Sequence, residues 1–129
     1  MLNGGIVSYA SKQLKVVAAS SCEAEYAAAT LCAHDLSFIR NVCDDLDFTV
    51  QGAVVLFVDN DACIKVAKDP GVSSANKHFE RGIHYIRDQC EHLRIDIIWV
   101  PTKHQMSDFM TKNLDTTQLQ YCRNYAFNT

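Results

Sequence analysis

Apolar residues along the chain follow strand periodicity in some stretches and helix periodicity in others. Strands are predicted over residues 6–19, 53–58 and 94–100. Helices are predicted over residues 20–45, 61–67, 76–93, 106–114 and 116–126. Strands that alternate with helices indicate an α/β fold, with parallel strands joined by right-handed crossovers. The chain has no internal repeat or linker, so we expect one domain over residues 1–129.

The helix predicted over 20–45 has a clear start signal. Ser20 and Glu23 form a capping-box pattern, in which Ser20 is the N-cap and Glu23 stands three residues later. Apolar residues at steps of three and four then predict the buried face: Ala29, Cys32, Leu36, Ile39, Cys43 and Leu46. Extending this stripe backwards by four residues reaches Glu25, so a carboxylate is expected in line with the core-facing side.

The other segments have simpler patterns. The run at 53–58 is continuously apolar, which predicts a central strand buried on both faces and placed between the other two. Trp99 is expected in the core. The helix over 76–93 should bury one face, made of Phe79, Ile83, Ile86 and Cys90. The turn signal at residues 3–5 has only one arm, which suggests that the sequence begins inside a structural unit.

Composition narrows the class of protein. With 129 residues, 48% hydrophobic and 21% charged, the chain matches one globular domain rather than a disordered or coiled-coil protein. No apolar run is long enough to span a membrane, and no signal peptide is visible, so an intracellular location is expected. The net charge of −3 argues mildly against a dedicated nucleic-acid binder. Six widely spaced cysteines without a Cys-x-x-Cys pair favour reduced thiols in a reducing compartment.

Three carboxylates come shortly after the three predicted strands: Glu25, Asp59 and Asp108. The carboxyl ends of parallel strands gather at one edge of a sheet, so these side chains can converge there. Such a group of carboxylates suits magnesium, and two such ions can activate water in phosphodiester hydrolysis. Structural explanations remain open beside this one. Asp59 could cap the helix that begins near residue 61, and Asp108 could be a first-turn acid favoured by the helix dipole.

Several basic residues are candidates for nucleic-acid contacts. Lys77, His78, Arg81, His84 and Arg87 lie on one predicted helix, where they could contact a phosphate backbone or form a solvated face. His104 precedes Asp108 by four residues and could assist protonation or product release, or be a solvated loop residue.

The motifs together resemble one family, the ribonuclease H domain of copia-type LTR retrotransposon polyproteins. The resemblance rests on residues 20–26 (Ser-Ser-Cys-Glu-Ala-Glu-Tyr), Val58-Asp59-Asn60, residues 76–80 through 84–87, Val100-Pro101-Thr102 and residues 105–112. It covers nearly the whole chain, with the motifs in the family's order. It implies a ribonuclease H-like fold that hydrolyses the RNA strand of an RNA–DNA hybrid with two Mg²⁺ ions. The family's carboxylates fall on Glu25, Asp59 and Asp108.

One part of the family pattern is not matched. The family's first aspartate lies on an opening strand, and no residue of this sequence corresponds to it. We therefore expect a truncated, carboxyl-terminal part of the domain, with about three largely parallel strands, weak magnesium binding and impaired catalysis. An unpaired edge of the first strand would favour a homodimer or aggregation.

The resemblance also implies partners and places. These are the RNA–DNA hybrid and the upstream reverse transcriptase region of the polyprotein, in the cytoplasm, in virus-like particles or in the nucleus. The alternative function is a non-catalytic remnant that binds nucleic acid or protein. A cysteine- and histidine-based metal or redox protein is the third and weakest hypothesis.

Overall fold

The computed structural model of this chain describes residues 4–15, 17–18, 20–69, 71 and 77–127. The side chains of residues 77 and 78 are not included. The chain divides into two compact units. The first, called here the sheet unit, is Leu14–Val100; the second, the terminal unit, combines Met1–Gln13 with Pro101–Thr129. The prediction of one domain over 1–129 stays a prediction.

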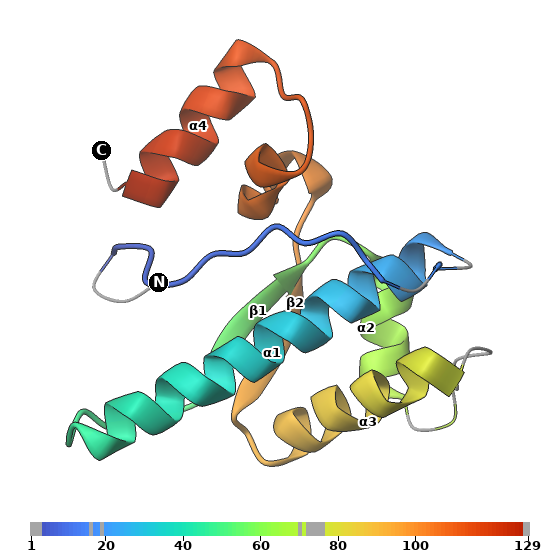
Figure 1. Ribbon diagram of the computed structural model, residues 1–129, viewed down its shortest axis with the longest axis vertical. Helices are drawn as coiled ribbons and strands as arrows, with labels where there is room; N and C mark the ends of the chain where they lie inside the picture. Colours follow the sequence, from blue (N-terminus) through green and yellow to red (C-terminus); the bar gives the residue numbers. More distant parts are fainter. Residues whose placement is uncertain (1–3, 16, 19, 70, 72–76, 128–129) are drawn as a thin grey trace. The chain divides into compact units, whose positions relative to one another are not determined.

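The sheet unit contains three helices and a two-stranded sheet (Figure 1). Its elements are α1 (Ser21–Asp45), β1 (Val54–Val58), α2 (Asp61–Lys68), α3 (Lys77–Glu91) and β2 (Ile95–Trp99). The two strands are parallel, and Leu56 lies opposite Ile97. Parallel strands require a crossover connection, which α2 and α3 provide. The α/β class is therefore confirmed, while the ribonuclease H-like fold stays a prediction.

The predicted first strand is wrong in the part of 6–19 that the structure describes. Residues 6–15 and 17–18 form no strand, and residues 16 and 19 lie outside the described residues. Among the described residues the sheet thus has two strands rather than three, and the helix over 20–45 is not a crossover between strands. A strand needs a hydrogen-bonded neighbour, which an alternating sequence pattern does not guarantee. In the part of the chain that the structure describes, β1 and β2 form the two outer strands of this sheet.

The expected burial of β1 on both faces is also wrong. Its residues alternate, with Leu56 and Val58 buried while Val55 and Phe57 are 42% and 51% exposed. Since the described sheet has two strands, β1 is an edge strand and not a central one. Trp99, expected in the core, is 50% exposed at the end of β2.

Helix α1 confirms the predicted boundaries and start signal. The Ser20 side chain caps it by accepting a hydrogen bond from the backbone N–H of Glu23 at 3.2 Å. The buried face is shifted from the predicted stripe, since it is made of Tyr26, Ala29, Ala33 and Cys43. Cys32, predicted in that stripe, is exposed.

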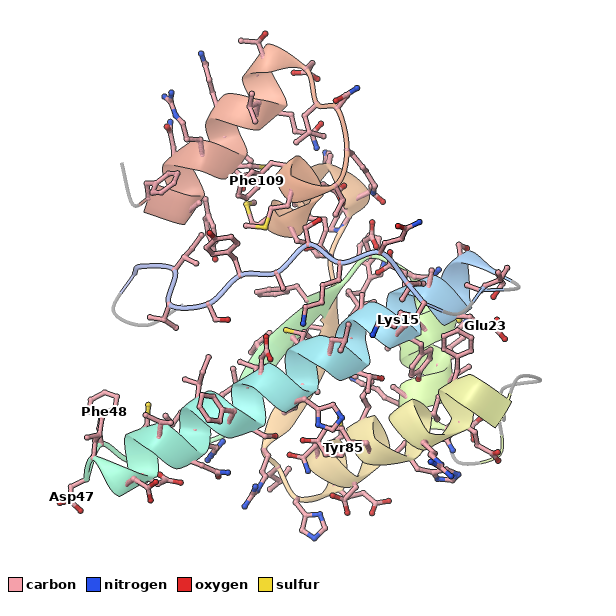
Figure 2. All side chains as sticks on the ribbon, viewed as in Figure 1. Lys15, Glu23, Asp47, Phe48, Tyr85 and Phe109 are labelled. Carbon is pink, nitrogen blue, oxygen red and sulfur yellow. The ribbon has the colours of Figure 1, made fainter. Side chains whose placement is uncertain are left out.

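Helices α1 and α3 pack against each other. A Cβ added at Gly82 of α3 would lie 2.5 Å from the Thr30 hydroxyl oxygen of α1, so a glycine is required for this close approach. Further along, the Tyr85 ring lies against α1, where it stacks on His34 with a centroid distance of 4.0 Å (Figure 2). The Tyr85 and Ser37 hydroxyls form a hydrogen bond of 2.8 Å.

The core of the sheet unit lies between the three helices and the sheet. The predicted buried face of α3 is confirmed, with Phe79, Ile83 and Ile86 buried and Cys90 partly buried. The buried cluster consists of Tyr26, Ala29, Ala33, Leu56, Val58, Cys63, Ala67, Ile83, Ile86, Ile95 and Ile97. The helices and strands of this unit are thus held mainly by aliphatic packing.

The terminal unit is built from short turns and one helix. Two 3₁₀ turns, η1 (Thr102–His104) and η2 (Met106–Met110), precede α4 (Thr116–Phe127). The prediction of α4 is confirmed, whereas the helix predicted over 106–114 is the shorter turn η2. The buried residues of α4 are Cys122 and Ala126. No helix among the described residues has the length and apolar character needed to cross a membrane.

Candidate functional site

Asp59 directly follows the carboxyl end of β1. Pairing with the segment that follows β2 continues to this point, because the Val100 backbone N–H donates to the Val58 carbonyl at 3.0 Å. The suggested capping role of Asp59 is wrong. Asn60 is the N-cap of α2, and its side-chain oxygen accepts from the Cys63 backbone N–H at 3.2 Å. The helix start therefore does not explain why a carboxylate occupies residue 59.

Glu25 lies near the amino-terminal end of α1, where Ser20 caps the helix. It precedes the buried Tyr26 and is itself half-buried. A carboxylate so close to the core is unusual, because removing its charge from water is unfavourable unless something compensates it. The expected position of Glu25, in line with the core-facing side of this helix, agrees with its partial burial.

The Cys63 thiol of α2 shows that Glu25 and Asp59 share one neighbourhood. Burial raises the pKa of this thiol to about 12, and the neighbouring Cys22 adds to the rise. The negative charges of Glu25 and Asp59 raise the same pKa further. Charges act on a titrating group in this way only at short range, so both carboxylates lie close to Cys63. Within the sheet unit, two of the three predicted carboxylates thus lie near the same thiol, and their convergence on one metal site stays a prediction.

The raised pKa also bears on thiol chemistry. A thiol with a pKa of about 12 stays protonated near neutral pH, while nucleophilic and metal-binding cysteines act as thiolates. All six cysteines are free, and Cys43, Cys63 and Cys122 are buried. These features give no support to the hypothesis of a redox or metal-binding protein.

Asp108 lies in the terminal unit, on η2. It is 6% exposed, and its Oδ1 atom is 2.9 Å from the Lys112 ammonium nitrogen. This ion pair accounts for the buried charge more directly than a helix dipole, because a buried carboxylate needs a charged or hydrogen-bonding partner. Since Glu25 and Asp59 belong to the sheet unit, the convergence of Asp108 with them stays a prediction.

The candidate metal site offers carboxylate oxygens. Mg²⁺ binds oxygen ligands and is commonly held by one or two carboxylates together with water and substrate phosphates. Glu25 and Asp59 fit this donor type, and Asp59 follows β1 directly. Across the ranges that the structure describes, no three His, Cys, Asp or Glu side chains are grouped so that they could hold a metal ion.

His104 lies on the exposed side of the terminal unit. It ends η1, and its ring meets the Tyr121 ring of α4 edge-on, with centroids 6.0 Å apart. His104 and Asp108 therefore belong to the same unit and to consecutive turns. A role of His104 in protonation or product release stays a prediction.

The basic residues of α3 have different surroundings. Arg81 and His84 are exposed, whereas the Arg87 guanidinium donates to the backbone carbonyls of Val66 at 2.6 Å and Asp69 at 2.7 Å. Arg87 thus binds the carboxyl end of α2, which favours a structural role. The predicted nucleic-acid contacts of Lys77 and His78 concern side chains outside the described residues. A nucleic-acid role of α3 stays a prediction.

Two features near the site were not found from the sequence. The spacing of four residues between Asp108 and Lys112 is a recognisable signal for an ion pair on a turn or helix. The second feature is the Tyr26 hydroxyl, which is buried without a hydrogen-bond partner among the described residues. Burial raises its pKa, and no local sequence pattern indicates that a tyrosine hydroxyl will be enclosed in this way.

Comparisons with known proteins show similarity to transposon polyproteins. The chain is 26% identical, over 94% of its length, to the retrovirus-related Pol polyprotein from transposon TNT 1-94 of Nicotiana tabacum. It is 29% identical, over 88% of its length, to the corresponding polyproteins from transposons RE1 and RE2 of Arabidopsis thaliana. Its relatives are transposon Pol polyproteins.

The similarity to these polyproteins is limited in extent. The chain spans only 8–9% of the length of these curated relatives. No protein-family model and no solved structure matches it. The expected relationship to retrotransposon polyproteins is confirmed, and the assignment to a ribonuclease H domain stays a prediction.

Proposed function

We propose that the chain is part of a retrotransposon polyprotein and contributes to hydrolysis of the RNA strand of RNA–DNA hybrids. The observation that carries the proposal is that Glu25 and Asp59 both lie near the Cys63 thiol, with Asp59 directly after the carboxyl end of β1. The similarity to Pol polyproteins over most of the chain supports the same context. The partners we propose are the hybrid and the upstream reverse transcriptase region, and the proposed location is intracellular.

The two carboxylates define the chemistry of the proposed site. Glu25 and Asp59 would hold Mg²⁺, which supplies activation of water and stabilisation of the leaving oxygen in phosphodiester hydrolysis. Asp59 directly follows a paired strand, which limits the movement of its backbone. Asp108 would complete the set of ligands, and His104 would hold or release a proton beside it.

We also propose that the 129 residues alone cleave the hybrid weakly. Two carboxylates in one neighbourhood provide fewer oxygen ligands than a pair of magnesium ions needs. The Lys112 ammonium group at 2.9 Å neutralises Asp108, which lowers the attraction of that carboxylate for a cation. Weak cleavage by the isolated chain is therefore the expected result.

The test is cleavage of a labelled RNA–DNA hybrid in the presence of Mg²⁺. It compares the 129-residue chain with a longer polyprotein segment that includes the upstream region. We expect strong cleavage only by the longer segment, and loss of this activity in its Asp59→Asn variant. The matched control is Asp61→Asn, an exposed acid two residues further along the chain. Efficient cleavage by Asp59→Asn, or none by the longer segment, would contradict the proposal.

The second candidate is a non-catalytic module that binds nucleic acid. The ion pair between Asp108 and Lys112 favours this function, because a predicted metal ligand is already paired with a cation. Under this alternative the longer segment binds the hybrid without cleaving it. Measuring binding and cleavage on the same labelled hybrid separates the two functions.

A further inference from the structure

Helix α4 buries its small residues and exposes its aromatic ones. Cys122 and Ala126 are buried, whereas Tyr121 and Tyr125 are 46% and 48% exposed. Burying an aromatic side chain contributes far more to stability than burying a cysteine or an alanine. The packing of the terminal unit therefore does not account for the position of these two rings.

Tyr121 and Tyr125 lie on one side of α4. They are four residues apart, which places them on neighbouring turns, about 6 Å apart along the helix axis. A third ring belongs to the same surface, because His104 meets Tyr121 edge-on with a centroid distance of 6.0 Å. We call the surface formed by Tyr121, Tyr125 and His104 the ring surface.

The ring surface is held in place by a contact between η1 and α4. The Gln118 side chain of α4 donates from Nε2 to the Lys103 backbone carbonyl at 3.3 Å. This bond lies one turn before Tyr121 and joins the helix to the residue next to His104. The rings from the two segments are thus positioned before any ligand arrives, which lowers the entropy lost on binding.

Positive charge is concentrated in the same unit. The terminal unit has four Lys or Arg residues, Lys12, Lys103, Lys112 and Arg123, but two acidic residues, Asp108 and Asp115. Both acids are engaged: Asp108 pairs with Lys112, and the Asp115 side chain accepts from the Gln118 backbone N–H at 2.9 Å. The sheet unit has the opposite balance, with eight Lys or Arg against thirteen Asp or Glu. The terminal unit therefore carries a net positive charge, which favours the approach of a polyanion.

Exposed rings beside cations fit single-stranded nucleic acid. Unpaired bases stack on aromatic side chains, and basic residues contact the phosphates between them. The bases of a duplex are already stacked within it and cannot use such rings. The competing explanation is that the ring surface binds a second copy of this chain. That explanation predicts a dimer of the protein.

We infer that the ring surface of α4 and η1 binds single-stranded RNA or DNA by stacking bases on Tyr121 and Tyr125, with Lys103 beside the phosphates. This binding goes beyond the proposed hydrolysis, because it requires neither a metal ion nor a hybrid. It is sequence-tolerant, since every base has a flat face, and it weakens as salt is raised.

The experiment measures fluorescence anisotropy of a labelled single strand of about 12 nucleotides, with EDTA present so that hydrolysis cannot occur. Replacing both rings in the variant Tyr121→Ala/Tyr125→Ala should weaken binding about tenfold or more. The variant Tyr121→Phe/Tyr125→Phe keeps the stacking faces and should bind like the original chain. The matched control is Tyr9→Ala, because Tyr9 is a 77% exposed tyrosine of the same unit outside α4.

The outcomes are distinct. Unchanged affinity of the double alanine variant, equal loss with Tyr9→Ala, or equally tight binding of a duplex of the same length would each overturn the inference. A dimer detected by light scattering and lost in the double alanine variant would assign the ring surface to a protein interface instead. Because both rings are half-exposed, the variants should melt at nearly the same temperature as the original chain. Failure of hybrid cleavage would not affect any of these measurements.

Discussion

The sheet unit and the terminal unit differ in what they bury. The sheet unit encloses branched aliphatic side chains such as Ile83, Ile86 and Ile97 between its helices and strands. Described buried residues of the terminal unit are Cys122, Ala126 and the carboxylate of Asp108. Aliphatic burial gives a strong, non-directional driving force, whereas a buried ion pair adds little net stability after desolvation. The first unit is therefore organised by its core, and the second depends on specific polar contacts.

The units also differ in charge. The sheet unit has an excess of acidic residues, and the terminal unit has an excess of basic residues. The net charge of −3 for the whole chain does not show this difference. The overall charge of this chain therefore describes neither unit. The sequence argument against a dedicated nucleic-acid binder applies to the sum and not to either unit.

The largest expected effect comes from the aliphatic core. Ile86→Ala removes a side chain with no exposed surface and should lower the free energy of unfolding by about 2–5 kcal/mol. The control is Ile98→Ala, at a position that is 41% exposed, which should have a much smaller effect. Urea denaturation followed by the fluorescence of Trp99, the single tryptophan, reports on the sheet unit. Equal effects of the two variants would contradict the described core.

The polar contact of the terminal unit should have a smaller but distinct effect. Lys112→Ala leaves the buried Asp108 carboxylate without its cation and should lower the free energy of unfolding by about 1–3 kcal/mol. Hydrogen exchange of the α4 amides reports on this unit. Lys12→Ala, an exposed lysine of the same unit, is the control. If both lysine variants exchange at the same rate, the ion pair is not what stabilises the unit.

The Cys63 thiol predicts a pH dependence that belongs to the sheet unit. Its pKa rises from 9.0 to about 12, so between these values the unfolded chain loses the proton while the folded chain keeps it. The unfolded state then binds fewer protons, and the free energy of unfolding falls as pH rises above about 9, by at most about 1.4 kcal/mol per pH unit. Cys63→Ala should have a shallower slope in urea denaturation series under reducing conditions. Below pH about 8 both slopes should be unaffected by the thiol, and an unchanged slope above pH 9 would contradict the buried position of Cys63.

The smallest effect separates the two neighbouring residues at the end of β1. Asn60→Ala removes the cap of α2 and should cost about 1 kcal/mol of stability. Asp59→Ala removes no cap and should change stability by less, even though Asp59 is the proposed metal ligand. Thermal melts of the two variants make the comparison. A larger loss with Asp59→Ala would mean that the carboxylate has a structural role.

Local signals were enough to predict most helices. The Ser20 cap and the spacing of Phe79, Ile83 and Ile86 act within one or two helical turns, so a sequence reader sees all of the partners. The site could be predicted in part for the same reason. The sequence predicts Asp59 directly after a strand and Glu25 near the start of a helix. The structure has both residues at these positions. Asn60, and not Asp59, caps α2. A difference of one residue in the helix boundary decides which side chain reaches the backbone N–H groups of the first turn.

The sequence by itself determined most of the helices, the positions of β1 and β2 along the chain, and the carboxylates that follow strand and helix ends, because caps and periodicity are local properties. Only the tertiary structure decided which of the segments with a strand-like or apolar pattern pair with, or pack against, another segment. Residues 6–15 alternate like a strand but form none, and Trp99 is exposed although it is apolar. Strand formation and burial both depend on a second segment, distant in the sequence, that supplies hydrogen bonds or covers a face. The same dependence joined Arg87 to the carboxyl end of α2, a contact that favours a structural role for this residue.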